Sequence, residues 1–404
     1  MSGPTPLSER LEVVDILRGV AILGILLVNM ELFSTPIYQT GMAHRLWPGW
    51  GDRTVDWLIR FLAEGKFYTM FSFLFGFGLA MQMERAQARG ARFVPLYVRR
   101  LFVLLLIGAA HALLLWIGDI LVTYAALGFI LLLFRNRTPR SLLIAAGLCL
   151  SLAIVINAAP AALDLYGERI AGAADRTEPV EADPTREWLA QQATRAYTQG
   201  RFAEIVQQRI RDLRFLYSFE LLVVFGVLTM FLLGLYAGRR GIFRDVAAHR
   251  PLIRGALWWG GGMGLAGSLA FALTATRESA PTDLIGAIGF EIGAPALSIA
   301  YMSGLTLLAQ QEAWRARLAP LAAVGRTALS NYLLQSLICT TIFYGYGLGL
   351  FATMGPAAGA ALAVGIYAVQ VVLSLWWLRR FQFGPIEWLW RSLTYLRVQP
   401  MRVP

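Results

Sequence analysis

Long apolar runs separated by short polar intervals are the main feature of this chain. Several runs reach about 18 residues, a length that spans about 30 Å of hydrocarbon as an α-helix. They are too continuous for barrel strands, in which apolar and polar residues alternate. The pattern predicts an all-α, polytopic transmembrane helix bundle, with residues 1–404 forming a single integral membrane domain. We expect about ten spans, near residues 14–33, 66–84, 101–117, 120–134, 141–159, 217–238, 254–275, 284–309, 321–346 and 357–378.

Three segments are polar enough to lie outside the hydrocarbon. Residues 160–215 are long enough for an extracytoplasmic insertion, with an acidic stretch at 175–183 and a predicted helix over 185–213. Residues 54–63 combine apolar and charged positions as a short interfacial helix does. Residues 381–404 mix aromatic residues with arginine, which predicts a cytoplasmic interfacial tail.

The charge pattern predicts the orientation. Charged residues make up 15% of the chain, against about 25% in soluble proteins. The net charge is +11, and Lys66 is the only lysine. The arginines concentrate in alternate short loops and at the C-terminal end, as cytoplasmic segments of membrane proteins do. We therefore predict that both termini are cytoplasmic and that membrane lipid, rather than nucleic acid, surrounds the protein.

Cysteine and histidine are scarce. The two cysteines, Cys149 and Cys339, both fall inside predicted spans, and only three histidines are present. We therefore expect neither a disulfide framework nor a metal site.

Ionisable residues inside the spans are the first functional candidates, because a charge in hydrocarbon costs several kcal/mol. Asp15 and Arg18 are three residues apart, on one helix face, and can pair. Asn29 lies on the same predicted helix, about 16 Å further along the axis. The set fits either a structural ion pair with an interhelical hydrogen bond or part of a substrate site.

A second group lies toward the predicted outer ends of the spans. Glu64 precedes Lys66, where it is either an interface charge or a site residue. His111 lies inside the third span with Asp119 eight residues on, and imidazole exchanges protons near neutral pH. His111 fits either a structural hydrogen bond or a catalytic base. His44, in the first outer loop, is either incidental or a second candidate base.

Arg326 and Asn331 open the ninth predicted span from the cytoplasmic side. A guanidinium in this position can hold a phosphate or a carboxylate through two parallel hydrogen bonds. The alternative is a topology charge that is slightly buried. The chain has no P-loop, no GxGxxG after a strand, no HExxH and no nucleophile elbow, so the sequence predicts neither ATP hydrolysis nor metal chemistry.

Several blocks resemble known families. VDILRGVAILGILLVN, residues 14–29, is similar to the first membrane span of heparan-α-glucosaminide N-acetyltransferase and its bacterial relatives. Over most of its length the chain resembles the bacterial YeiB family, whose members are sometimes described as transport-related. The blocks are EGKFYTMFSFLFGFGLAMQMERA (64–86), HALLLWIGDILVTYAALG (111–128), GRTALSNYLLQSLICTTIFYGYGLGLF (325–351) and FQFGPIEWLWRSLTY (381–395). The resemblance implies a multi-span protein of the bacterial cytoplasmic (inner) membrane.

The acetyltransferase resemblance implies a reaction. That family moves an acetyl group from cytosolic acetyl-CoA across the membrane to an amino sugar. Its outer-facing site uses an asparagine at the end of the first span and a histidine shortly after it. Asn29 matches the asparagine. The expected histidine position is Thr40, and the nearest histidine is His44.

The first predicted function is a membrane acyltransferase, with acetyl-CoA or another acyl-CoA as co-substrate and a small-molecule sugar or amine as acceptor. His111 or His44 would act as the base, and Asn29 would donate to the oxyanion. Asp119 and Glu64 complete the predicted catalytic set. The residues predicted near the coenzyme are Asp15, Arg18, Arg326 and Asn331.

Two other functions remain open from the sequence. The first alternative is a secondary transporter or permease for a small solute, coupled to protons through groups such as Glu64 and His111. The other is a structural or sensory protein in which residues 160–215 bind a partner. A homodimer is a further expectation, because glycine-rich spans such as 260–267 can pack against a second copy.

Overall fold

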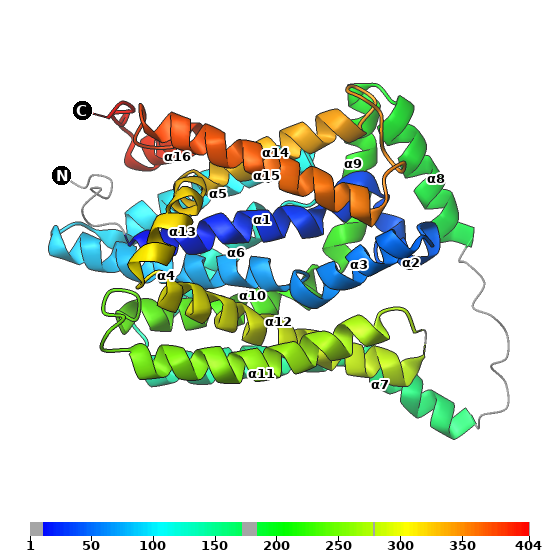
Figure 1. Ribbon diagram of the computed structural model, residues 1–404, viewed down its shortest axis with the longest axis horizontal. Helices are drawn as coiled ribbons and strands as arrows, with labels where there is room; N and C mark the ends of the chain where they lie inside the picture. The colour runs from blue at the N-terminus through cyan, green and yellow to red at the C-terminus, as the bar shows by residue number, and fades with distance from the viewer. Residues whose placement is uncertain (1–10, 172–183, 278, 404) are drawn as a thin grey trace.

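The computed structural model is a bundle of long helices that run side by side along the longest axis of the molecule (Figure 1). It describes residues 11–171, 184–277 and 279–403. Over these residues the regular structure is helical, apart from one isolated β-bridge between Phe381 and Arg402. The prediction of an all-α bundle is confirmed. The acidic stretch predicted at 175–183 lies outside the described residues.

In the described part of the chain, nine of the ten predicted spans each correspond to one helix, and the span predicted over 321–346 corresponds to two. Seven helices are long and apolar enough to cross a membrane: α1 (Glu12–Ser34), α5 (Phe93–Leu114), α7 (Pro139–Ala171), α10 (Glu220–Arg239), α11 (Arg250–Thr274), α12 (Ala280–Leu308) and α15 (Pro356–Leu378). Three more form at predicted positions: α4 (Lys66–Ala88), α6 (Leu121–Leu133) and α14 (Ala328–Phe343). The 13 residues of α6 span about 20 Å, less than the hydrocarbon thickness. The loop at 115–120 before α6 is therefore covered by other parts of the chain.

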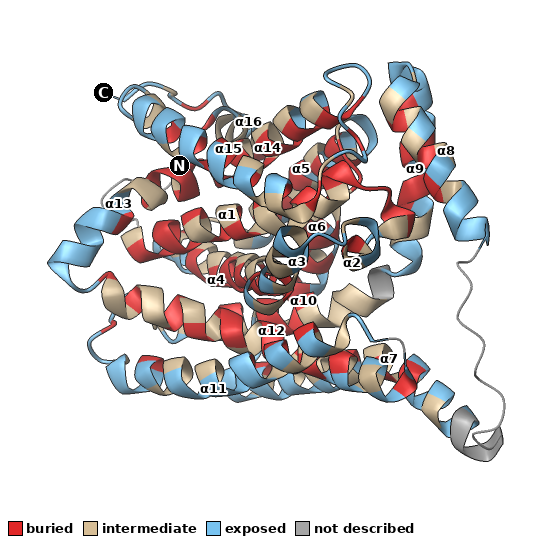
Figure 2. Ribbon diagram, turned by 45° about the vertical axis from the view of Figure 1, so that its right-hand side comes forward, coloured by how far each residue is buried: buried red, intermediate tan, exposed pale blue. Residues whose placement is uncertain are grey.

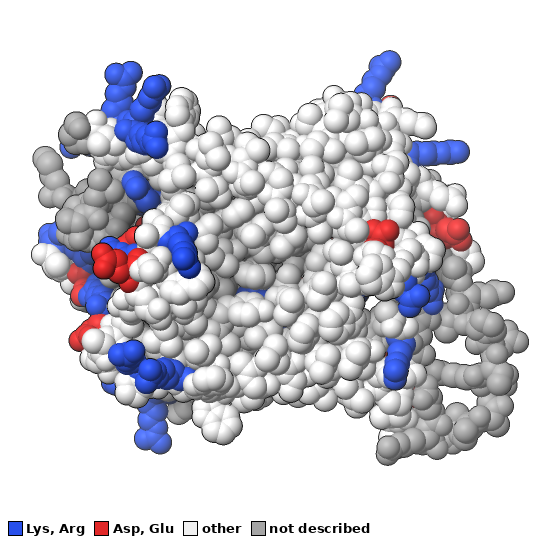
Figure 3. Space-filling view, in the orientation of Figure 1, with Lys and Arg blue, Asp and Glu red and all other residues white. Residues whose placement is uncertain are grey.

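The apolar surface identifies the chain as a membrane protein. Trp258 and Trp259 on α11 are 77% and 76% exposed, and Leu148 on α7 is 67% exposed. Exposed residues run along the length of α11 (Figure 2). The charged side chains gather at the two ends of the molecule and leave an almost uncharged band between them (Figure 3). A surface of this kind is stable against lipid, whereas in water it would drive association.

The two ends of the bundle carry different short helices. The start of α1 lies at the same end as α13 (Glu312–Arg326) and α16 (Pro385–Tyr395), and we call this the terminal end (Figure 1). The opposite end, here the distal end, carries α2 (Ala43–Leu46), α3 (Trp50–Leu62), α8 (Pro184–Gln199) and α9 (Phe202–Ser218). The start of α1 and the helix α16 thus share one end of the bundle.

Two predicted helices are each divided in the structure. The span predicted over 321–346 breaks at Thr327, between α13 and α14. The carboxylate of Glu387 on α16 accepts hydrogen bonds from the amides of Leu329 and Ser330, at 2.7 and 3.1 Å. This remote cap satisfies donors that a new helix start leaves unpaired. The helix predicted over 185–213 breaks near Gly200 into α8 and α9, which pack on each other.

The predicted interfacial helix at 54–63 is confirmed as part of α3, but its polar face points inward. Trp50 is 84% exposed and Leu58 is 41% exposed, whereas Asp56 and Arg60 are buried. Arg60 Nε donates to Asp56 Oδ2 at 3.0 Å. A helix lying on water would have the reverse arrangement, so this one places its apolar face toward lipid and its ion pair toward the protein.

Glycine allows two close helix crossings. A Cβ at Gly325 of α13 would lie 1.8 Å from the carbonyl oxygen of Asp15 in α1, and one at Gly19 would lie 2.0 Å from that of Leu321. In α11, a Cβ at Gly264 would lie 2.4 Å from the backbone nitrogen of Leu297. In the glycine-rich stretch 260–267, three of the five glycines pack against α12 of the same chain and the other two meet open space. The homodimer stays a prediction.

Candidate functional site

His111, Asp119 and Ser336 form a buried hydrogen-bonded series. His111 Nδ1 lies 2.7 Å from Asp119 Oδ1, and His111 Nε2 lies 2.8 Å from Ser336 Oγ. The three residues are 2%, 7% and 0% exposed, in that order. They come from α5, from the loop after it, and from α14. The imidazole thus connects a carboxylate to a hydroxyl, in the order found in nucleophile–base–orienter sets.

The loop between α5 and α6 positions Asp119. Asp119 Oδ2 accepts a hydrogen bond from the amide of Val122 at 2.8 Å, which caps the first turn of α6. Trp116, in the same loop, stacks on Phe33 of α1 with ring centroids 3.8 Å apart. Arg209 of α9 donates to the carbonyl of Leu113 at 2.8 Å. The loop is therefore fixed by groups from three separate helices.

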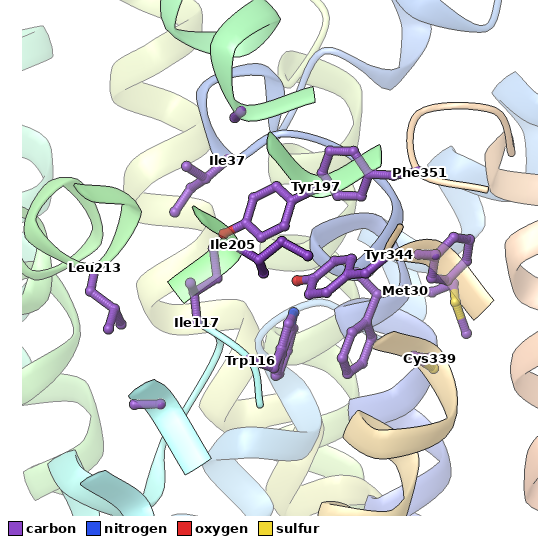
Figure 4. Close-up of a cluster of buried hydrophobic side chains, with 14 of the residues drawn as sticks. Met30, Ile37, Trp116, Ile117, Tyr197, Ile205, Leu213, Cys339, Tyr344 and Phe351 are labelled. Carbon is purple, nitrogen blue, oxygen red and sulfur yellow. The ribbon is translucent and has the colours of Figure 1, made fainter. Parts of the chain in front are cut away.

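A hydrophobic cluster at the distal end covers this loop. Trp116 lies among Tyr197, Ile205 and Tyr344, which come from α8, from α9 and from the segment after α14 (Figure 4). Beside the cluster, Asp212 accepts hydrogen bonds from Tyr38, Tyr197 and Gln208, at 2.9, 2.7 and 2.8 Å. Burial raises the pKa of the Asp212 carboxyl. The α8–α9 hairpin is thus attached to the bundle as a packed cap.

A cavity of about 230 Å³, the terminal cavity, enters the bundle from the terminal end. A neighbouring cavity of about 160 Å³ shares Arg18, Arg100, Arg326 and Arg391 with it. Arg326 Nε is buried and has no hydrogen-bond partner among the described residues. The other charged residues of the two cavities are Asp15, Arg85 and Glu387. With five arginines and two carboxylates, the pair of cavities attracts anions.

The inner end of the terminal cavity is lined by neighbours of the buried series. Ile120, Leu121 and Tyr332 line it. The first two follow Asp119 directly, and Tyr332 precedes Ser336 by one turn of α14. The rings of Tyr332 and His111 lie 5.1 Å apart, and Tyr332 Oη donates to the carbonyl of Gly118 at 3.0 Å. The cavity therefore runs from an arginine-rich mouth to the neighbours of a histidine–serine pair.

A third cavity, of about 340 Å³, lies at the distal end of the bundle, and we call it the distal cavity. Its polar lining includes Asn29, Glu31, Asp56, Arg60 and Glu64. Glu31 Oε1 accepts from the amide of Gly41 at 2.9 Å. Burial raises the pKa of the Glu64 carboxyl. The aromatic side chains Trp47, Phe215 and Phe219 complete the lining. The distal cavity thus offers carboxylates and an amide together with aromatic faces.

The terminal cavity and the distal cavity have lining residues close to each other on α1. Ile25 lines the terminal cavity and Asn29 lines the distal one. Four residues of helix separate these positions, which is about 6 Å along the axis. On α5, Leu104 lines the terminal cavity, and His111 lies seven residues further along, or about 10 Å. Along α1, the linings of the two cavities are thus about one helical turn apart.

The predicted site residues fall into three groups. Arg18 and Arg326 line the two terminal-end cavities and Asp15 lines one of them, with the predicted Arg18–Asp15 pair formed at 3.2 Å. Asn29 and Glu64 line the distal cavity. His111 and Asp119 form the buried series.

The two remaining predicted site residues belong to none of these groups. His44 lies on α2 and is not among the residues that line the distal cavity, although its neighbour Ala43 is. Asn331 is buried, and its amide donates to the hydroxyls of Thr327 and Ser374, at 2.9 and 3.0 Å. Its hydrogen bonds hold helices together.

Sequence reasoning missed Ser336. The hydroxyl lies in an apolar span, 225 positions after its histidine partner, and no local motif marks it. The one available signal was the polar pair Gln335–Ser336 within that span. Such a pair is also common where helices simply hydrogen-bond to each other in a membrane.

Comparison with known proteins gives consistent matches over the whole chain. The chain is 39% identical to uncharacterized protein YxaH of Bacillus subtilis (strain 168), covering 98% of this chain and 97% of that protein. It is 32% identical to uncharacterized protein YeiB of Escherichia coli (strain K12), covering 97% and 98%. An uncharacterized 39.9 kDa protein of Bacillus acidopullulyticus is 27% identical over 98% of this chain and 97% of its own. Residues 237–397 match the family model described as protein of unknown function (DUF418).

Proposed function

We propose that this protein is a membrane acyltransferase. The chain belongs to the YeiB-like family of multi-span membrane proteins, and the proposal proceeds from that membership. The donor is an acyl-CoA bound at the terminal end, and the acceptor is a small molecule with an amine or hydroxyl group at the distal end. The observation that supports this most directly is the terminal cavity, which joins an arginine-rich mouth to the neighbours of His111 and Ser336.

The mouth suits the phosphates of coenzyme A. Guanidinium groups bind phosphate oxygens in pairs, and a half-buried site strengthens each contact relative to water. Arg326 brings a buried Nε with no partner among the described residues. The carboxylate of Glu387 accepts hydrogen bonds from the amides that begin α14, and the arginines still outnumber the carboxylates in the two linings. The donor headgroup is therefore held by Arg18, Arg100, Arg326 and Arg391.

The apolar interior suits the acyl end of the donor. Beyond the arginines, the terminal cavity is lined by residues such as Leu104, Leu121 and Tyr124. A thioester that reaches this end lies beside His111, the general base of the proposal. Asp119 holds the imidazole with Nδ1 protonated, which leaves the Nε2 lone pair to take a proton.

The distal cavity suits the acceptor. Asn29 and Glu64 supply hydrogen-bond groups, and the aromatic residues provide faces for an apolar or ring-shaped body. Lining residues of the two cavities are about 6 Å apart along α1, so the acyl group has a short distance to travel between them.

Calorimetry with acetyl-CoA and the purified protein in nanodiscs tests the proposal. We expect binding that weakens as salt is added, since the contacts are ionic. Arg326→Ala and Arg18→Ala should each weaken binding about tenfold or more, which corresponds to the loss of a charge-assisted hydrogen bond. The matched control is Arg254→Ala, an exposed arginine on α11. If folded protein binds neither acetyl-CoA nor longer acyl-CoAs, the acyltransferase proposal is wrong.

A secondary transporter is the second candidate. Two cavities reach inward from opposite ends of the bundle, and a buried histidine–carboxylate pair lies between them. Alternating access would use the same arrangement. Solute-dependent changes in thiol labelling at cysteines introduced in both cavities, without acyl-CoA binding, would favour this candidate.

We also propose that the terminal end faces the cytoplasm of a bacterial inner membrane. This orientation places the arginine-rich mouth on the side where acyl-CoA is made, and it follows the bias of arginine toward cytoplasmic loops. Reporter fusions after Arg402 and within the α11–α12 loop test it. They should report opposite sides of the membrane, with the C-terminal fusion inside.

A further inference from the structure

The hydroxyl of Ser336 differs from that of an ordinary helix serine in the partner that it contacts. Its Oγ lies 2.8 Å from His111 Nε2, but 3.4 Å from the carbonyl of Tyr332 in the preceding turn. Serine in a membrane helix ordinarily donates back to that carbonyl. Here the shorter contact is with the imidazole.

The tautomer of His111 is assigned from its other partner. Asp119 Oδ1 is an acceptor when ionised, so the proton on the imidazole lies on Nδ1. Nε2 is then an acceptor, and the Ser336 hydroxyl donates to it. Asp119 is itself fixed by the amide of Val122 at 2.8 Å. Nucleophile, base and orienting carboxylate are therefore hydrogen-bonded in the order that activates a serine.

The position of Ser336 relative to the terminal cavity matches this role. Tyr332 lines the inner end of the cavity, and Ser336 is four residues later on the same helix face, about 6 Å along the axis. The ring of Tyr332 lies beside His111, the partner of the serine, and the Tyr332 hydroxyl donates to the carbonyl of Gly118, next to Asp119. Ser336 is fully buried and does not itself line the cavity, so an acyl group has to pass Tyr332 to reach its hydroxyl.

We propose that Ser336 is the nucleophile that takes the acyl group from acyl-CoA and holds it as an ester. The inference rests on the proposed acyltransferase function and adds a covalent intermediate to it. Ser336 Oγ bonds to the thioester carbonyl carbon while His111 Nε2 takes the hydroxyl proton. The carbon–sulfur bond breaks, and the leaving thiolate receives that proton from Nε2 to give free coenzyme A.

The second half returns the enzyme to its starting state. The amine or hydroxyl of the acceptor attacks the ester carbonyl while His111 Nε2 takes its proton. The bond between the acyl carbon and Ser336 Oγ breaks, and the serine oxygen recovers the proton from Nε2. The net change is transfer of one acyl group from sulfur to the acceptor. No oxidant or metal takes part in this balance.

Acyl-enzyme trapping tests the proposal on the full chain in nanodiscs. Radiolabelled acetyl-CoA is added without acceptor, the reaction is quenched in acid, and the labelled peptide is identified by mass spectrometry. We expect a burst of free coenzyme A close to one per protein and an acetyl group on Ser336 that hydroxylamine removes. Ser336→Ala and His111→Ala should each lower the label at least about 100-fold. Ser336→Cys should carry the acetyl group as a thioester.

The matched control is Ser298→Ala on α12, which removes another fully buried hydroxyl and should leave the label unchanged. Thermal unfolding shows whether each variant is folded. If Ser336 is only structural, Ser336→Ala changes the unfolding temperature, but the wild type shows no burst of coenzyme A from acetylation of Ser336.

Two results would overturn the inference, and they differ. If acetyl-CoA binds and transfer to added amines continues in Ser336→Ala at more than about half the normal rate, Ser336 is not the nucleophile. The acyltransferase function then stands with direct transfer or with another carrier. If acetyl-CoA and longer acyl-CoAs do not bind the folded wild type, the function and the nucleophile fail together.

Discussion

The substitution Gly325→Ala should force α1 and α13 apart where they cross. The added Cβ would lie 1.8 Å from the carbonyl oxygen of Asp15 and 2.7 Å from its carbonyl carbon. A carbon–oxygen contact needs about 3.3 Å, so the helices must separate by about 1.5 Å. Both obstructing atoms are backbone, and neither can rotate away.

The cost follows from overpacking. Inserting a methyl group into a closed contact costs about 1–3 kcal/mol, and a rigid backbone contact belongs at the upper end. Alanine recovers up to about 1 kcal/mol through its better helix propensity. The net destabilisation of Gly325→Ala is then about 2 kcal/mol, which in a chain of 404 residues lowers the unfolding temperature by about 2–3 °C.

The same separation should reach the candidate site. Arg18 on α1 and Arg326 on α13 flank the crossing and line the terminal cavity. Moving the helices apart changes the spacing of the two guanidinium groups, and we expect acetyl-CoA to bind about tenfold more weakly, as for the loss of one charged contact.

The assay is thermal unfolding in detergent, followed by calorimetry with acetyl-CoA. The control is Gly261→Ala on α11, where a new Cβ meets open space. That variant should unfold at or slightly above the wild-type temperature. If Gly325→Ala unfolds within about 1 °C of wild type, the close approach of α1 and α13 is not as described, and the reasoning fails.

Three further predictions concern the buried series, the distal cap and the distal cavity. Asp119→Asn should lower the turnover of acyl transfer by about 10³–10⁴-fold and leave acetyl-CoA affinity unchanged in calorimetry, because the imidazole then takes the wrong tautomer. An equal loss of affinity would contradict this. Tyr197→Phe removes a donor to the buried Asp212 carboxylate and should destabilise the protein by about 1–3 kcal/mol in thermal unfolding. Tyr166→Phe, at a site 65% exposed, is the neutral control. Glu64→Gln should gain stability relative to wild type as pH rises above the ordinary carboxyl pKa of 4.5, because burial raises the Glu64 pKa in the folded state and ionisation then favours unfolding. A difference in unfolding temperature that does not change with pH would contradict this assignment.

The amino-acid pattern by itself determined the helices and their environment. In lipid, a single segment can pair all of its backbone N–H and C=O groups when it forms a helix. A long apolar run such as 254–275 therefore predicts a helix almost directly. The same reasoning found Asp15 and Arg18, because two residues on one helix are placed by the helix itself. It also assigned Asn29 and Glu64 to one end of the bundle, where both now line the distal cavity.

The tertiary structure decided what depends on contacts between helices. Glu387 caps α14 from 57 and 58 residues away and divides a run that reads as one span. Asn331 looked like a ligand residue, but the neighbouring hydroxyls of Thr327 and Ser374 take its hydrogen bonds. The pairing of Ser336 with His111 joins two helices over 225 positions. Apolar periodicity records which face of a helix avoids water, but in lipid every face does. The sequence therefore identified residues that can carry chemistry, whereas the packing of the helices determined which of them lie in contact.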